Sequence, residues 1–240
     1  MRTIFWAGDS TVQYNSILTY PQTGLGQVFH LFCKNDVKIS NHGKNGRSTK
    51  SFLDEGRFQP ILEEMGEGDF LFIQFGHNDE KIHDPSRYTE AFGSFQDNLR
   101  FFIQKAREKK AIPVLISPLE RRCFDENGVL GPGEHGDYVE GMKQVAAEQQ
   151  VAFIDLCSMS RELLIQAGSQ ETTHWYMNLQ PGKYEVCPEG KIDNTHLKYA
   201  GAVKFAGLIA KGLKTLGGEY EALLLTEEDL AKDDIFDVHP

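Results

Sequence analysis

The sequence predicts an α/β fold, a three-layer αβα sandwich built around a parallel, doubly wound sheet of five strands in one domain. Two observations lead to this prediction. Short apolar runs alternate along the chain with segments of helical periodicity. Polar motifs follow directly after several of the apolar runs, which is where open α/β sheets bind their ligands.

Five apolar runs predict the strands. They cover residues 3–7, 37–40, 69–75, 112–117 and 151–155. The run 69–75 (DFLFIQF) is the strongest, and it is nearly continuous rather than alternating. Continuous apolar runs are typical of parallel strands that helices cover on both faces.

Apolar residues spaced three and four apart predict helices between these strands. The clearest spans 88–110, where Phe92, Phe95, Leu99 and Phe102 fall on one face. Further helices are predicted over 137–149, 158–167 and 197–216. The aromatic-rich segment 171–191 breaks the alternation and is predicted to be a long ordered loop, a feature that is often functional. Residues 1–218 are therefore predicted to form the main domain.

The acidic segment 219–240 is predicted to be an extension that packs on or near this domain. It carries apolar residues, and Thr226 followed by Asp229 predicts a short capped helix. A partner or homodimer contact is the alternative for this segment.

Composition excludes several classes of protein. The formal net charge is −10, with 35 acidic against 25 basic residues, so a nucleic-acid partner is not expected. No stretch approaches the roughly 18 apolar residues of a membrane span. The first apolar run is too short for a signal peptide. Four cysteines, Cys33, Cys123, Cys157 and Cys187, lack disulfide or metal spacing and predict reduced thiols in a cytoplasmic protein.

Three motifs follow predicted strands. Gly8-Asp9-Ser10-Thr11 comes after the first strand, where a serine at a strand-to-helix turn can expose its hydroxyl. The glycine-containing run 41–48 (NHGKNGRS) follows the second, and residues 76–79 (GHND) follow the third. Glycine lets a backbone N–H approach a ligand, and Asn78 can offer a side-chain N–H while Asp79 braces its loop. Taken singly, each motif also fits an ordinary helix cap or an Asx turn.

A fourth motif, Asp193-Asn194-Thr195-His196, precedes the last predicted helix. A separation of three residues lets the Asp193 carboxylate reach the imidazole of His196 and leaves the other ring nitrogen free as a base. A lone histidine is more often structural. Together, however, the four motifs supply a nucleophile, a base, a base-orienting group and hydrogen-bond donors, which is the complete set for acyl transfer.

The motifs GDST, NHGKNGRS, GHND and DNTH resemble, in order, the four sequence blocks of the SGNH (GDSL-like) hydrolase superfamily. The stretches FWAGDSTV, QFGHND, SPLERRCFDENG and HWYMNLQPGKY are most similar to the rhamnogalacturonan acetylesterase group. The resemblance implies the SGNH hydrolase fold with its flavodoxin-like sheet. It implies Ser10 as nucleophile, His196 as base and Asp193 as its orienting group. The backbone N–H groups of Ser10 and Gly46 and the side chain of Asn78 would form the oxyanion hole.

The resemblance also implies an acetylated oligosaccharide as substrate and no cofactor. Trp175 and Tyr184 are candidates for stacking on a sugar, although they can equally hold their loop against the body. Arg122, or its neighbour Arg121, is a candidate for a galacturonate carboxylate, with a surface ion pair as the alternative.

Other chemistries find less support in the sequence. A metal site made from His42, His77, His174 and His196 lacks any HExxH-type spacing. A thiol hydrolase that uses Cys123 or Cys187 has no supporting motif, and no GxGxxG or P-loop sequence indicates a nucleotide. An acetylxylan esterase, a short-chain esterase or a lipase of the same superfamily is the nearest alternative enzyme. A catalytically inactive carbohydrate-binding protein is the alternative outside the enzymes.

Overall fold

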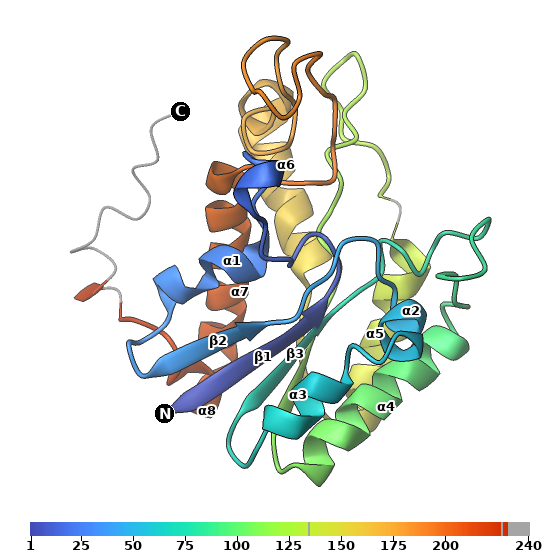
Figure 1. Cartoon of the computed structure of the whole chain (residues 1–240), viewed down its shortest axis with the longest axis vertical. Coiled ribbons are helices and arrows are strands. Elements are labelled where there is room, and N and C mark those ends of the chain that lie inside the picture. The colour runs from blue at the N-terminus through green and yellow to red at the C-terminus, as the bar shows by residue number, and fades with distance from the viewer. Residues whose placement is uncertain (134, 227, 230–240) are drawn as a thin grey trace.

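A five-stranded parallel sheet forms the centre of the protein (Figure 1). The structure is a computed structural model that describes residues 1–133, 135–226 and 228–229. The strand order is β2-β1-β3-β4-β5, so the predicted doubly wound fold is confirmed. The strands are β1 (Arg2–Gly8), β2 (Val37–Asn41), β3 (Phe70–Gln74), β4 (Ile112–Ile116) and β5 (Ala152–Ile154).

Helices cover both faces of the sheet, which explains why the strand sequences are apolar throughout. Every residue of β3 is buried. In β1, Ile4 and Trp6 belong to one core cluster, whereas Phe5 and Ala7 belong to the other. Side chains that alternate along one strand therefore fill two separate cores, one on each side of the sheet.

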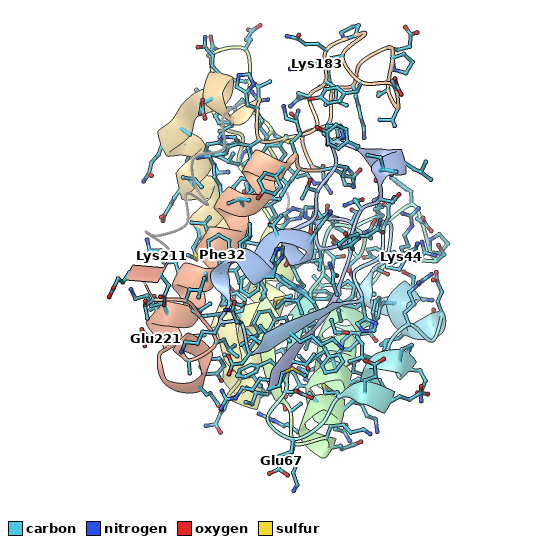
Figure 2. All side chains as sticks on the ribbon, turned by 60° about the vertical axis from the view of Figure 1, so that its left-hand side comes forward. Phe32, Lys44, Glu67, Lys183, Lys211 and Glu221 are labelled. Carbon is cyan, nitrogen blue, oxygen red and sulfur yellow. The ribbon has the colours of Figure 1, made fainter. Side chains whose placement is uncertain are left out.

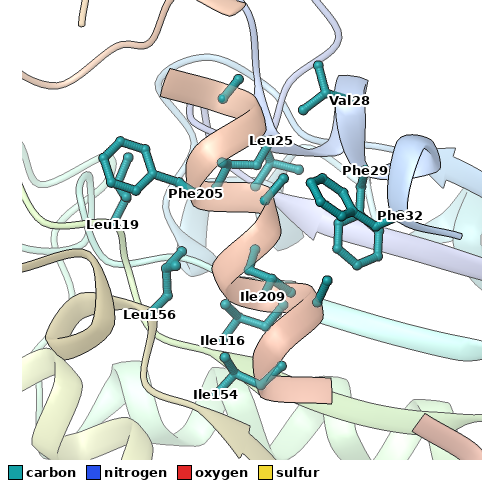
Figure 3. Close-up of a cluster of buried hydrophobic side chains, with 14 of the residues drawn as sticks. Leu25, Val28, Phe29, Phe32, Ile116, Leu119, Ile154, Leu156, Phe205 and Ile209 are labelled. Carbon is teal, nitrogen blue, oxygen red and sulfur yellow. The ribbon is translucent and has the colours of Figure 1, made fainter. Parts of the chain in front are cut away.

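The first face packs against α1 (Leu25–Val28), α6 (Leu156–Thr172) and α7 (Tyr199–Leu216). Figure 3 shows α7 crossing this core, with Phe205 and Ile209 among side chains from the sheet and from α1. The second face packs against α2 (Thr49–Asp54), α3 (Gln59–Glu64), α4 (Ser94–Glu108) and α5 (Gly136–Gln149). Short 3-10 turns cover Ile17–Thr19 and Phe29–Phe32.

Two predicted helices differ from the structure at their ends. The helix predicted from residue 88 begins at Ser94, and Phe92, expected on its buried face, is 52% exposed. Residues 88–93 form a loop instead, because Thr89 is tied to Asp79 by a 3.0 Å hydrogen bond. The helix predicted over 158–167 extends from Leu156 to Thr172, with Asp155 as its N-cap and a kink at Gly168 (φ 79°).

The segment after α7 packs back onto the first core. Helix α8 (Gly218–Glu221) is followed by Leu223 and Leu224, which are buried, and Leu224 forms an antiparallel bridge with Cys33. The predicted cap is present, since the Asp229 backbone N–H donates to the Thr226 hydroxyl oxygen at 3.2 Å and the Thr226 N–H donates to the Asp229 carboxylate at 3.1 Å. The apolar residues Ile235 and Phe236 lie outside the described residues. Within the described ranges, no helix has the length and apolarity to cross a bilayer.

Candidate active site

Ser10, His196 and Asp193 form a continuous chain of hydrogen bonds at the carboxyl end of the sheet. The Nε2 atom of His196 lies 2.9 Å from the Ser10 hydroxyl oxygen. The Nδ1 atom of the same ring lies 2.8 Å from a carboxylate oxygen of Asp193. The sequence prediction joined these residues across 186 positions, and the fold brings them together.

Ser10 lies in a tight turn directly after β1. The Asp9 carboxylate accepts hydrogen bonds from the backbone N–H and the hydroxyl of Thr11, both at 2.8 Å. Burial raises the pKa of Asp9, although the two Thr11 hydrogen bonds oppose the shift. The sequence predicted Ser10 at a turn from a strand into a helix. That prediction is wrong, because the chain turns through Thr11 and Val12 and the first α-helix begins only at Leu25.

Gly8 ends β1 at a position where a side chain would not fit. A Cβ atom there would lie 2.7 Å from a Val12 methyl group and 3.0 Å from the Gln74 carbonyl oxygen of β3. The close packing of this turn against β3 holds Ser10 at the sheet edge.

Hydrogen bonds within its own loop and from a lysine hold Asp193 in position. One carboxylate oxygen accepts from the backbone N–H groups of Thr195 and His196 at 3.0 and 2.9 Å. The other accepts from His196 and lies 2.6 Å from the Lys191 ammonium. Partial burial alone would raise the pKa of Asp193, but the hydrogen bonds from His196 and Lys191 outweigh it and lower the pKa. The carboxylate is therefore ionised over the working range of an enzyme.

The predicted oxyanion donors Gly46 and Asn78 lie on two loops that a hydrogen bond connects. The Asn78 amide nitrogen donates to the Arg47 carbonyl at 3.0 Å, which leaves its second hydrogen available and ties it to the loop that carries Gly46. Gly46 has a φ of 77°, a conformation that favours glycine. Among the described residues, the backbone N–H groups of Ser10 and Gly46 have no hydrogen-bond acceptor.

Asp79 holds the loop that carries Asn78 in place. Its carboxylate is fully buried and accepts hydrogen bonds from the Thr49 backbone, the Thr49 hydroxyl and the Thr89 hydroxyl. Burial raises the pKa of Asp79 to about 7, against the opposing effect of these hydrogen bonds. Thr49 begins α2 and Thr89 precedes α4, so Asp79 fixes the Asn78 loop to both elements.

A buried group of polar side chains lies behind the Asn78 loop. Donor atoms of His77, Glu80 and His135 lie within 4.8 Å of one another, an arrangement that can suit a metal ion. However, the Arg121 guanidinium lies 2.6 Å from one Glu80 oxygen, and the His135 ring nitrogen lies 2.7 Å from the other. A cation would meet the positive charge of Arg121 there, so we assign the group a structural role.

Sequence reasoning missed Glu80 and His135 as neighbours of the site. Glu80 directly follows the GHND motif, which was a usable signal, but His135 is 55 residues further along the chain. Burial and the nearby His135 lower the pKa of His77 well below its usual value, so its ring is neutral.

Of the three residues predicted to bind substrate, Trp175 and Arg122 have structural roles instead, whereas Tyr184 stays a candidate. Trp175 is only 3% exposed, packs edge-on against Phe205 and donates to Glu171 at 3.2 Å, so the prediction that it stacks on a sugar is wrong. The ring is buried because the 171–191 loop packs onto α7, where Phe205 lies. Tyr184 is half-buried, and its ring lies 5.9 Å from that of Tyr20.

The Arg122 guanidinium is occupied by protein acceptors. It donates to the hydroxyls of Thr172 and Thr173 at 3.0 and 2.7 Å, to the Ser169 carbonyl, and to the Asn194 side chain at 3.3 Å. Among the residues that the structure describes, Arg122 therefore has neither of the two partners predicted from the sequence, which were a substrate carboxylate and an acidic side chain in a surface ion pair. Arg122 joins the end of α6 to the loop that holds Asp193 and His196.

A polar pocket of about 430 Å³ opens beside Gly46. Its basic residues are already paired with acidic ones: Arg47 with Glu55, Lys50 with Asp54, and Arg87 with Asp84.

The chain belongs to the GDSL-like lipase/acylhydrolase family, whose model matches residues 7–202. The predicted family and the predicted enzyme class, a carboxylic ester hydrolase, are thereby confirmed. The chain is 40% identical over 227 residues to the rhamnogalacturonan acetylesterase RhgT of Bacillus subtilis (strain 168), covering 94% of this chain and 95% of that protein.

Solved structures show the same fold. The crystal structure of YxiM from Bacillus subtilis superposes with a TM-score of 0.76 at 27% identity, covering 90% of this chain and 57% of that one. The acetylxylan esterase Axe2 from Geobacillus stearothermophilus gives a TM-score of 0.61 at 14% identity, covering 91% of this chain and 95% of that one.

Proposed function

We propose that this protein is a serine esterase that removes O-acetyl groups from pectic oligosaccharides of the rhamnogalacturonan type. The observation that carries the proposal is the hydrogen-bond chain from Ser10 through His196 to Asp193. The similarity to an acetylesterase over nearly the full length of both chains supports the substrate class.

In the proposed reaction His196 removes the proton from the Ser10 hydroxyl as its oxygen attacks the acetyl carbonyl carbon. Asp193 holds the ring so that Nε2 faces Ser10 and stabilises the imidazolium that forms. The negative charge on the carbonyl oxygen is stabilised by the N–H groups of Ser10, Gly46 and Asn78. His196 then protonates the departing sugar hydroxyl. Water, activated by the same histidine, releases acetate and restores Ser10.

Thiol chemistry is a poor alternative for the buried cysteines. Burial raises the pKa of Cys33 and that of Cys157 to about 12, so neither is a thiolate at neutral pH. The Cys187 thiol lies 3.2 Å from the Gly190 carbonyl, within the 171–191 segment, and none of the described residues offers it a hydrogen-bonded base.

We further propose that the protein acts in the cytoplasm on imported oligosaccharides, in line with the composition and cysteine spacing of the chain. Fractionation of native cells followed by detection of the protein tests this compartment. Recovery outside the cytoplasm would contradict it.

The test of function is acetate release by wild type and by Ser10→Ala. Three substrate sets should be compared: acetylated rhamnogalacturonan oligosaccharides, acetylated xylo-oligosaccharides, and p-nitrophenyl esters of increasing acyl length. We expect acetate mainly from the pectic fragments and none above background with Ser10→Ala.

Each other outcome selects a different alternative. Preference for the xylo-oligosaccharides would indicate an acetylxylan esterase, and rates that rise with acyl length would indicate a lipase-like enzyme. No hydrolysis of any ester by folded wild type would leave a carbohydrate-binding protein and overturn the proposal.

A further inference from the structure

Two lysines, one in the loop between α6 and α7 and one close to His196 in sequence, have no anionic partner among the described residues. Lys198 lies two residues after His196 and caps α7, and Lys183 lies in the loop between α6 and α7. In the described part of the chain, neither ammonium group forms an ion pair or a side-chain hydrogen bond.

Several other cations near the site are paired, whereas Lys44 and Lys81 likewise form no ion pair in the part of the chain that the structure describes. Arg47 and Arg87, on the side of Gly46, lie 2.9 and 2.6 Å from acidic partners. Lys191 lies 2.6 Å from Asp193. Positive charge is therefore available to a ligand on the side of Lys183 and Lys198.

Burial makes this arrangement costly. Lys198 is half-buried, and the resulting desolvation, together with the nearby charge of Lys183, lowers the pKa of Lys198. Two cations close together without a counter-ion raise the electrostatic energy of the free protein, and an anion bound between them would relieve it.

Aromatic rings accompany the two lysines. The Lys183 ammonium lies 6.0 Å from the centre of the Tyr184 ring, which in turn lies 5.9 Å from the Tyr20 ring. Tyr20 is 57% exposed. A tyrosine offers an apolar ring face and a polar hydroxyl, both of which a sugar can contact.

The backbone connects this surface to the catalytic residues. Gln22 and Lys198 form an antiparallel bridge, and the Thr23 N–H donates to the Leu197 carbonyl at 2.9 Å. The segment that follows Ser10 and the segment that follows His196 therefore meet here. The loop between α6 and α7 rises above the carboxyl ends of the strands (Figure 1), and Figure 2 shows Lys183 at its outer end.

We propose that Lys183 and Lys198 form a subsite for the carboxylate of a uronic acid residue in the substrate, with Tyr20 and Tyr184 contacting the sugar rings. The proposal rests on the proposed function. It assigns recognition of an acidic oligosaccharide to this surface and not to Arg122 or to the pocket beside Gly46.

The test compares two forms of one acetylated uronate-containing oligosaccharide, with its carboxylates either free or methyl-esterified. The variants are Lys183→Met, Lys198→Met and the double variant. Lys211→Met is the matched control. Lys211 is exposed on α7, the helix that Lys198 precedes, and Figure 2 shows Lys211 far from Lys183. The readout is the ratio of kcat/KM for the free acid to that for the methyl ester, in which general effects on catalysis cancel.

We expect each single variant to lower this ratio by about 2- to 5-fold and the double variant by more, because exposed ion pairs contribute modestly. Added salt should lower the wild-type ratio as well. Lys211→Met should leave it unchanged.

The alternative results separate two failures. A ratio that no lysine variant changes, in an enzyme that deacetylates both forms, would overturn the subsite while the proposed function stands. If wild type hydrolyses p-nitrophenyl acetate but neither oligosaccharide, the proposed substrate class itself is wrong, and the subsite with it.

Discussion

The two sides of the site each depend on an aspartate, and the two aspartates are held in opposite ways. Asp79, on the strand side beside Asn78, is fully buried among neutral donors, and burial raises its pKa to about 7. Asp193, on the loop side beside His196, is part-exposed, and hydrogen bonds from His196 and Lys191 lower its pKa. The comparison indicates that Asp79 holds the Asn78 loop in place. Asp193 instead stabilises the positive charge that develops on His196 during the reaction.

The largest effect is expected on the loop side. Asp193→Asn keeps the size of the side chain but removes the negative charge that orients and stabilises His196. We predict that kcat on p-nitrophenyl acetate falls by about 10⁴-fold, the scale known for this substitution in serine hydrolase triads, while the far-ultraviolet circular dichroism spectrum stays that of wild type. A fall of less than tenfold in a folded variant would show that Asp193 is not the orienting group.

A smaller effect is expected for the oxyanion donor on the strand side. Asn78→Ala removes one of three donors, and we predict a loss of about 10²- to 10³-fold in kcat with little change in KM. Asn78→Asp, which has similar size but reversed polarity, should lose at least as much. An unchanged kcat in Asn78→Ala would show that the Asn78 side chain does not stabilise the oxyanion.

The pH dependence of stability should separate the two aspartates directly. The pKa of Asp79 is higher in the folded protein than the ordinary value of 3.8, so its contribution favours folding at low pH and is lost as pH rises toward about 7. The pKa of Asp193 is lower than 3.8, so its contribution is present above that pH and is lost as pH falls below it.

Urea unfolding of wild type, Asp79→Asn and Asp193→Asn between pH 3 and pH 8 measures both effects. We expect Asp79→Asn to lose stability relative to wild type at pH 5 and to approach wild type by pH 8. The difference between Asp193→Asn and wild type should instead stay constant from pH 8 down to about pH 4 and begin to narrow only near pH 3. Parallel curves for all three proteins would contradict the assigned shifts.

The smallest effect on catalysis is expected for Arg122, which supports the loop side from behind. Arg122→Ala removes hydrogen bonds to α6 and to Asn194, and we predict a loss of about 1–3 kcal/mol in the free energy of unfolding. Its kcat should fall by less than that of Asp193→Asn, and equally on charged and neutral esters. A loss confined to substrates with a free carboxylate would restore Arg122 as a substrate contact.

The strand side was largely predictable from sequence. Ser10 and Asn78 follow apolar runs, and parallel strands bring their carboxyl ends to one edge, so local pattern is sufficient. The pair Asp193 and His196 was equally accessible, because a spacing of three residues lets the two side chains meet.

The surroundings of the loop were not predictable in the same way. Whether Trp175 faces a sugar or Phe205, and whether Arg122 meets a ligand or Thr173, depends on how the 171–191 segment folds onto α7. No periodicity encodes that packing. The contact of His135 with Glu80 likewise joins distant segments of irregular backbone.

The central claim is that Ser10 is a nucleophile activated by His196, and covalent labelling tests it most directly. Wild type, His196→Ala and Ser10→Ala should be incubated with a fluorophosphonate ester, and labelling followed by intact-protein and peptide mass spectrometry. We expect rapid modification of wild type at Ser10 alone, labelling of His196→Ala slowed by orders of magnitude, and none in Ser10→Ala. Modification of wild type at another residue, or equal rates in wild type and His196→Ala, would contradict it.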